Sequence, residues 1–343
     1  MTLRLPIFAF SLSLAGILSA HDGTDSIHND SFVATSPDEK AWTGDGDYKF
    51  ATTPDWGAPP KGQAPGSTHG GVVRDKAGNV YVSTNTKGIL IYTAEGAFQK
   101  AIGAEFKEIH GLNIREEKGE EFIYAAWLGG GHAIKMKLDG TVLLKIPCPM
   151  ESGKYKDAKQ FKVTSVDSAP DGSIFVADGY GLSFIHKFDA TGKYLLSFGG
   201  DGTDDDHFKT CHGVGVDLRG EKPLLLVCDR ANRRLQHFDL NGKFVANVAK
   251  NLNLPCAVSF DGKMVAIAEL QGRVTILDGS NKEVAHLGDN QDPKQRGNYN
   301  VPPDQWKPLL FTAPHGLCWD GKGGLFVEDW NATGRVRHLG RLK

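Results

Sequence analysis

Residues 163–199 read VTSVDSAPDGSIFVADGYGLSFIHKFDATGKYLLSFG, and this stretch decides the fold. Four short apolar runs alternate with turn residues, among them Asp171-Gly172 and Thr191-Gly192. Glycine supplies the positive φ that tight hairpin turns require, and short apolar runs between such turns are typical of β-strands. The stretch therefore predicts four short strands in succession.

The same pattern recurs along the chain, and four of its copies open on a histidine followed by glycine. Six copies begin near His69, His110, Thr164, His212, Cys256 and His315. Repeated four-stranded units of roughly 40 to 50 residues are typical of a β-propeller. We therefore predict an all-β fold, a six-bladed β-propeller over residues 48–343.

The last copy contains only three clear strands, so its sheet lacks an outer strand. The strand-like residues 48–52 have no partner in their own unit, and we expect them to join the last blade and close the ring. Two longer segments, around 145–160 and 289–308, are predicted to be loops on a rim. Prolines in the second of these exclude a central strand there.

The N-terminus differs from the rest of the chain. Arg4 precedes an almost wholly apolar run from Leu5 to Leu18, and small residues lie just before His21. This is typical of a secretory signal peptide over residues 1–20 and is too short for a spanning helix. Residues 21–47 are polar and are predicted to be a flexible lead-in. We therefore expect a secreted or periplasmic protein with no stable membrane span.

Composition narrows the function classes. The net charge is −2, so nothing points to nucleic acid. The five cysteines are odd in number and form no C-x-x-C pair, which leaves at most a partial disulfide pattern that the sequence does not define. We expect a monomer acting on a small-molecule or peptide-like substrate, with a protein partner as an open alternative.

The recurring histidines are the strongest functional signal. In a propeller the innermost strands line the axis, so residues at the start of each copy converge there. Three imidazoles with an open fourth position form the ligand set of a catalytic zinc site. The alternative is that each histidine caps a turn by bonding to neighbouring backbone.

Two further residues, Tyr180 and Arg230, follow the second strands of their blades and should share a face with the histidines. Near a metal, a tyrosine can act as a base and an arginine can hold an anion. The alternatives are a half-buried aromatic residue bonded to backbone for Tyr180 and a salt bridge between blades for Arg230.

These residues resemble a known family. The stretches 165–180, 188–194, 208–213 and 229–238 look like the NHL-repeat propeller of peptidyl-α-hydroxyglycine α-amidating lyase, closely over residues 160–245 and more loosely elsewhere. The resemblance implies an NHL-type propeller whose activity is the cleavage of a carbinolamide N–C bond, releasing an amide and glyoxylate.

The resemblance also implies roles for individual residues. His110, His212 and His315 would hold zinc, Tyr180 would accept the hydroxyl proton, and Arg230 would stabilise the developing charge.

This chain departs from the family pattern at several positions. The family's first-blade arginine is missing near Ser83-Thr84-Asn85. Gly316 replaces an aspartate that helps to bind structural calcium, which weakens the expectation of a calcium ion. His69 is additional, and it stays open whether it is a fourth ligand, a supporting group or a replacement for the arginine.

Two functions from different classes follow. The first is an exported zinc-dependent lyase similar to peptidyl-α-hydroxyglycine α-amidating lyase. The alternative is a non-catalytic NHL propeller that binds a protein, peptide or glycan, because propellers serve both purposes.

Overall fold

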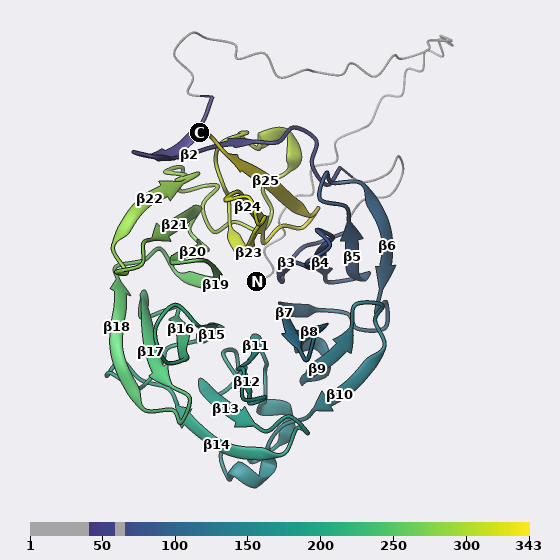
Figure 1. Cartoon of the computed structure of the whole chain (residues 1–343), viewed down its shortest axis with the longest axis vertical. Helices are drawn as coiled ribbons and strands as arrows, with labels where there is room; N and C mark the ends of the chain where they lie inside the picture. The colour runs from purple at the N-terminus through teal and green to yellow at the C-terminus, as the bar shows by residue number, and fades with distance from the viewer. Residues whose placement is uncertain (1–40, 59–65) are drawn as a thin grey trace, which may run out of the picture. The chain divides into compact units, whose positions relative to one another are not determined.

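Six β-sheets surround a central axis, as the computed structural model shows for residues 41–58 and 66–343 (Figure 1). The predicted signal peptide and residues 21–40 of the predicted lead-in lie outside the described residues. Within them the architecture confirms the predicted six-bladed propeller, with one innermost strand of each blade next to the axis.

Each of the first five blades is a four-stranded antiparallel sheet in chain order. Their strands, from the axis outward, are β3 (Val72–Arg74), β4 (Val80–Thr84), β5 (Gly88–Tyr92) and β6 (Phe98–Ile102) in blade 1; β7 (Ile109–Glu117), β8 (Glu120–Trp127), β9 (His132–Lys137) and β10 (Val142–Ile146) in blade 2; β11 (Ser165–Ser168), β12 (Ile174–Ala177), β13 (Phe184–Phe188) and β14 (Tyr194–Gly199) in blade 3; β15 (Cys211–Asp217), β16 (Leu224–Asp229), β17 (Arg234–Asp239) and β18 (Phe244–Lys250) in blade 4; and β19 (Pro255–Asp261), β20 (Met264–Glu269), β21 (Arg273–Leu277) and β22 (Glu283–Leu287) in blade 5.

Blade 6 is built from both ends of the propeller. Its inner strands are β23 (Pro314–Trp319), β24 (Leu325–Asp329) and β25 (Arg335–Arg341), and β2 (Tyr48–Thr52) pairs with β25 in the register Phe50↔Arg341. The predicted closure by residues 48–52 is therefore confirmed. A fifth strand, β1 (Thr43–Asp45), pairs with β2, so the sheet begins within the last residues of the predicted lead-in.

The core lies between neighbouring blades rather than inside any one of them. One apolar cluster joins Ile89 and Ile91 of blade 1 to Ile109 and Ile123 of blade 2, and all four side chains are buried. Burying an aliphatic side chain of this size contributes roughly 1.5–3 kcal/mol. Because the ring is closed, every blade packs against two neighbours and both faces of each sheet are covered. Phe50 of β2 is fully buried in an apolar cluster with side chains of blades 5 and 6. Truncating the Phe50 side chain would therefore weaken the closure of the ring.

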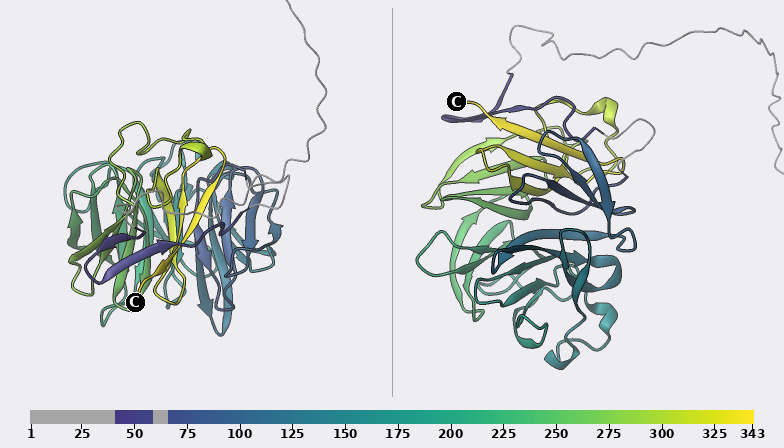
Figure 2. Two further views of the ribbon diagram at one scale, coloured as in Figure 1. Left: turned by 90° about the horizontal axis from the view of Figure 1, so that it is seen from above. Right: turned by 45° about the vertical axis from the view of Figure 1, so that its right-hand side comes forward.

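Two longer segments connect blades 2 and 3 and blades 5 and 6, where longer loops were predicted. The first contains the short 3-10 helices η2 (Met150–Ser152) and η3 (Ala158–Gln160), and the second contains η4 (Pro303–Gln305). A further 3-10 turn, η1 (Leu128–Gly130), connects β8 and β9. Seen from the side, η4 projects beyond the strands on one face of the ring (Figure 2).

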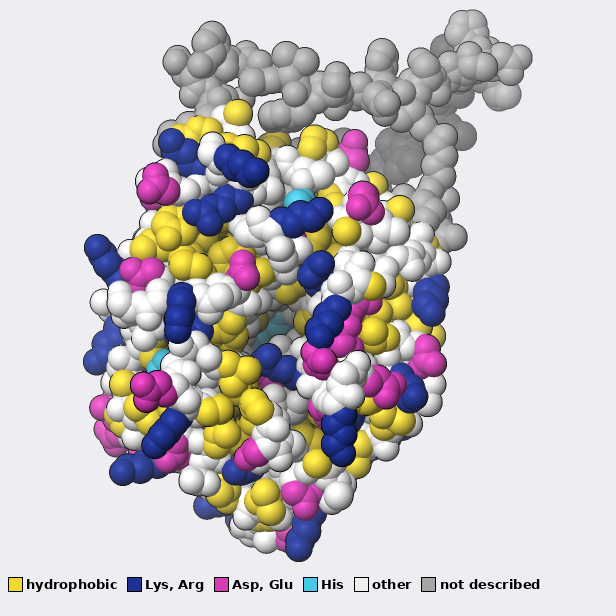
Figure 3. All heavy atoms as spheres, viewed as in Figure 1, with side chains coloured by type: hydrophobic (Ala, Val, Ile, Leu, Met, Phe, Trp, Pro, Cys, Tyr) yellow, Lys and Arg dark blue, Asp and Glu magenta, His cyan; other side chains and the backbone are white. Residues whose placement is uncertain are grey.

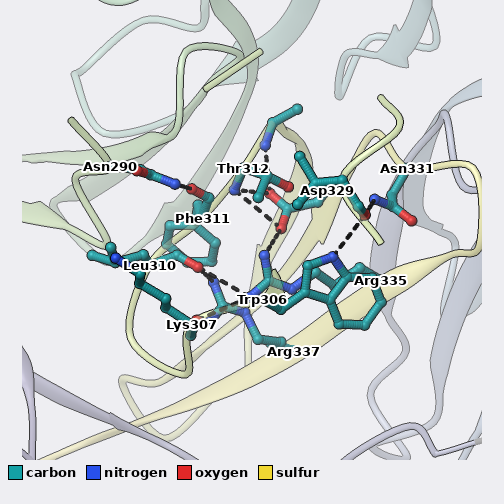
Figure 4. A network of polar contacts seen from close by, with 12 residues as sticks. Asn290, Trp306, Lys307, Leu310, Phe311, Thr312, Asp329, Asn331, Arg335 and Arg337 are labelled. Atoms are coloured by element: carbon teal, nitrogen blue, oxygen red, sulfur yellow. Dashed lines mark hydrogen bonds and ion pairs between the residues drawn. The ribbon is translucent and has the colours of Figure 1, made fainter. Parts of the chain in front are cut away.

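Arginines of β25 hold the second longer segment in place (Figure 4). Arg335 pairs with Asp329 at 2.9 Å and donates to the carbonyl oxygens of Lys307 and Leu310 at 3.1 and 3.0 Å. Arg337 donates to the same Leu310 oxygen at 2.8 Å. Hydrogen bonds to charged groups contribute more than neutral ones, so the segment leading into β23 and His315 is firmly positioned.

All five cysteines are buried and unpaired, so the described residues contain no disulfide. No helix among the described residues is long and apolar enough to cross a membrane.

Candidate metal centre

The three histidines of the predicted triad stand at bulges near the start of the innermost strands of blades 2, 4 and 6. Pairing between the first and second strands shifts register at each point, as it does between Ile109 and Gly111 around His110. A bulge leaves its extra residue unpaired and redirects that side chain. His110, His212 and His315 therefore leave the sheets and meet at the axis.

Glycine is required for steric reasons after each of the three triad histidines. A Cβ atom on it would come too close to a backbone carbonyl of the next blade: 2.7 Å for Gly111 against Thr164, 2.3 Å for Gly213 against Cys256 and 2.6 Å for Gly316 against Gly70. The same three carbonyl oxygens accept hydrogen bonds from the histidines: 2.7 Å from His110 Nδ1, 2.8 Å from His212 Nδ1 and 3.2 Å from His315 Nδ1. The dipeptide thus lets one blade bind the histidine of its neighbour.

The three imidazole rings form an equilateral triangle. The ring centroids of His110, His212 and His315 are 4.7 Å apart in all three pairs. Each Nδ1 carries the proton it donates to a carbonyl, so each Nε2 is unprotonated and can act as a metal ligand. Histidine ligands of metals usually bond in this way through their second nitrogen, which fixes the tautomer.

Burial keeps the rings neutral. It lowers the pKa of His110, His212 and His315 well below 6.5, and neighbouring positive or titratable groups lower it further. Neutral imidazole is the form that binds metals. His315 Nε2 is buried without a hydrogen-bond partner, and a buried polar atom in that state needs an explanation. The residues therefore fit a divalent ion.

Two overlapping sets of side chains could hold such an ion, each with its ligand atoms within 4.8 Å of one another. They are His69, His110 and His315, and His212, Cys256 and His315. Together they contain the whole predicted triad, with His315 common to both. The ring of His69 lies 4.7 Å from His110 and 4.9 Å from His315, so the structure brings this additional histidine into the cluster.

Tyr180 lies over two of the triad histidines. Its hydroxyl oxygen is 3.2 Å from His110 Nε2 and 3.1 Å from His212 Nε2. The turn that carries it is fixed by the buried Asp178, whose carboxylate accepts the backbone N–H groups of Lys162 and Leu182 at 2.6 and 2.7 Å. Burial raises the pKa of Tyr180 above 10, and the nearby Arg230 acts in the opposite direction.

Arg230 completes this side of the centre. Its Nη1 donates to the Tyr180 hydroxyl at 3.1 Å, and its guanidinium lies 5.1 Å from the centroid of the Tyr180 ring. The salt bridge that Arg234 makes with Asp229 leaves that carboxylate occupied, so Arg230 is oriented towards the tyrosine rather than its acidic neighbour. A cation beside a phenol stabilises the phenolate.

The triad also forms the inner end of a cavity along the axis. The cavity has a volume of about 230 Å³ and is lined by the innermost strands, from His110 and His315 to Arg74 and Arg115. The molecule is hollowed at this place in Figure 3. This cavity reaches the triad, but neither Tyr180 nor Arg230 lines it.

Known proteins resemble this chain in sequence and in fold. No protein-family model matches the chain. The probable peptidyl-alpha-hydroxyglycine alpha-amidating lyase pgal-1 of Caenorhabditis elegans is 28% identical over 203 residues, which cover 58% of this chain and 57% of that protein. The peptidyl-glycine alpha-amidating monooxygenase of Mus musculus is 26% identical over 232 residues, which cover 64% of this chain and 22% of that protein. The chain thus spans between about a fifth and somewhat over half of these curated relatives.

Among solved structures, a streptogramin B lyase aligns over 89% of this chain and its own full length, with a TM-score of 0.57 and 14% identity. This likeness shows the propeller fold alone. The sequence relatives are named as peptide-amidating enzymes. The chain resembles the α-amidating lyases.

The departures from this lyase pattern lie together in the structure. Asn85, in the place of the expected arginine, directly follows β4, and its Oδ1 is buried without a partner. His69 packs between the triad and Trp330, whose ring centroid is 5.6 Å away. Gly316 leaves no room for the aspartate of the family pattern, because even a Cβ atom would contact Gly70.

Sequence reasoning missed Glu328 and Trp330. Glu328 is fully buried in β24, opposite Gly316, and its Oε1 accepts the N–H of Gly70 at 2.8 Å. Burial raises the pKa of Glu328 to about 8. The available signal was an acidic pair that ends the apolar run Leu325–Val327 in an inner strand, but its contact with blade 1 depends on ring closure.

Proposed function

We propose that this protein is an exported zinc-dependent lyase that cleaves the N–C bond of an α-hydroxyglycine derivative and releases an amide and glyoxylate. One observation carries the proposal: the Tyr180 hydroxyl lies within 3.2 Å of His110 Nε2, His212 Nε2 and Arg230 Nη1. The proposed base therefore contacts two potential metal ligands and the proposed anion-binding group. The relative named as a probable amidating lyase supports the reaction class, and the apolar N-terminal run supports the export.

Zinc bound by the three histidines would supply a Lewis acid that lowers the pKa of a coordinated hydroxyl and of the nearby phenol. Tyr180, as the phenolate, is placed to accept the proton of the substrate hydroxyl. As that oxygen becomes the aldehyde oxygen of glyoxylate, the C–N bond breaks, and the proton passes to the amide nitrogen. Arg230 is placed to bind the substrate carboxylate and the charge that develops beside it.

Glyoxylate release tests the proposal. Zinc-loaded protein should convert a peptide ending in α-hydroxyglycine to the amide and glyoxylate in equal amounts. Tyr180→Phe should lower kcat by about 100-fold or more, in line with the loss of a positioned acid–base group. Tyr194→Phe is the matched control, because that hydroxyl bonds to Ser197 in an outer strand.

Two results would contradict the proposal. One is a wild-type rate equal to that of the uncatalysed reaction, which would favour a non-catalytic propeller. The other is a Tyr180→Phe variant as active as the Tyr194→Phe control.

A further inference from the structure

Cys256 occupies in blade 5 the position that histidines occupy in blades 2 and 6. The register between β19 and β20 shifts between Pro255 and Ala257, so Cys256 is the bulge residue, as His110 and His315 are in their blades. The residue is buried, with 1% of its surface exposed. The fold therefore presents its thiol to the axis in the same way as it presents the imidazoles.

The surroundings of this thiol are those of a ligand. Its Sγ and the ring nitrogens of His212 and His315 lie within 4.8 Å of one another. His315 Nε2 has no hydrogen-bond partner. The thiol donates to the carbonyl oxygen of Leu254 at 3.6 Å, and the charge of Arg230 opposes the burial that raises the pKa of this thiol to about 11. None of the other four cysteines belongs to a potential ligand set among the described residues.

We infer that Cys256 Sγ is the fourth ligand of the metal in the substrate-free protein, giving a set of three histidines and one thiolate. The inference rests on the metal centre of the proposed function. Thiolate is a strong zinc ligand, and its negative charge offsets part of the charge of the ion. The flanking Arg230 stabilises the same sulfur. His69 belongs to blade 1, on the other side of blade 6 from Cys256, and is partly exposed against Trp330.

This ligand set has a consequence for regulation. Zinc with four protein ligands has no open position, whereas catalytic zinc sites keep one. The substrate hydroxyl would therefore have to displace Cys256 Sγ from the metal, and the charge of Arg230 would favour the released sulfur as thiolate. Cys256 then protects the ion until a hydroxy acid enters.

Cobalt substitution of the full chain tests the inference. Co²⁺ bound to the metal-free wild type should show a sulfur-to-cobalt charge-transfer band in the near ultraviolet. Cys256→Ser should retain the visible cobalt bands and lose the charge-transfer band, whereas the matched control Cys318→Ser should keep both. Glycolate carries the hydroxyl and carboxylate of the proposed substrate without the scissile bond, so saturating glycolate should reduce the band in wild type.

A second measurement needs no variant. X-ray absorption of zinc-loaded wild type should show one sulfur at about 2.3 Å beside nitrogens at about 2.0 Å. Cobalt or zinc bound through nitrogen and oxygen alone would overturn the role of Cys256 and leave the triad intact. Failure to bind either ion would overturn the metal centre itself. A charge-transfer band unaffected by glycolate would overturn the ligand exchange.

Discussion

The two sides of the metal centre differ in how completely they are bonded. On the side of blades 3 and 4, Tyr180 and Arg230 bond to each other and to the triad, and the sequence resembles the amidating lyases most closely. On the side of blades 6 and 1, the buried polar atoms without a partner include Asn85 Oδ1, His315 Nε2 and Glu328 Oε2. Such atoms are uncommon in folded proteins.

This difference separates two roles. The first side contains the groups that the proposed reaction needs for proton transfer and charge stabilisation. The second side carries every departure from the family pattern, including His69 and Gly316. The proposed reaction therefore depends on the first side, while the second side is where this chain differs from the lyase pattern. The predictions below alter one side at a time.

The largest effect is the pH dependence that Glu328 gives to the stability of the metal-free protein. Its pKa of about 8 in the folded state exceeds the ordinary value of 4.5, mainly because of burial. The folded protein therefore holds a proton that the unfolded chain has lost between these pH values, so stability falls as the pH rises from about 5 to 8. At about 1.4 kcal/mol per pH unit, the loss reaches at most about 5 kcal/mol.

Urea unfolding at pH 5, 7 and 9 measures this loss. Glu328→Gln keeps an oxygen for the Gly70 N–H but cannot ionise, so its stability should fall less over this range. The difference between the two proteins removes the contribution of other titrating groups. Parallel stability curves would show that Glu328 is not a buried neutral acid.

The next effect concerns Arg230, on the side of blades 3 and 4. Arg230→Ala removes the group that holds developing charge, and kcat/KM for an α-hydroxyglycine peptide should fall about 100-fold. Arg233→Ala is the matched control, since that side chain donates to Asn253 at 2.8 Å instead of to Tyr180. Equal losses of kcat/KM in both variants would contradict a specific role of Arg230 in charge stabilisation.

A smaller effect on activity is expected from replacing His69, on the side of blades 6 and 1. His69→Asn should retain the metal and lower kcat/KM by about tenfold, mainly through a higher KM, because the residue would contact substrate rather than the reacting atoms. Steady-state kinetics with metal analysis distinguish the outcomes. Loss of the metal in this variant would instead assign His69 as a ligand.

Much of the fold follows from local sequence signals. Hairpin turns such as Asp171-Gly172 and the recurring His-Gly pairs indicate the number of blades and their inner strands, because turn geometry is set by nearby residues. The closure by residues 48–52 was also predictable, since an open sheet edge and an unpaired strand were both visible.

The site was less predictable. Sequence spacing brings His110, His212 and His315 to the axis, but the contacts of Glu328 with Gly70 and of Cys256 with Arg230 join different blades. Such contacts depend on the distance and angle between neighbouring sheets, which no local pattern encodes. The extension of the last sheet by β1 was missed because its three residues, Thr43–Asp45, are too few and too polar to show an alternating pattern.

Metal analysis of purified protein tests the central claim most directly. After expression with added zinc, the wild type should contain about one equivalent per chain, and His110→Ala, His212→Ala and His315→Ala should each lose most of it, because removing one of three imidazoles opens the ligand set. His132→Ala, which alters a histidine of an outer strand, should retain the metal. A wild type without a transition metal, or triad variants that keep a full equivalent, would contradict the account.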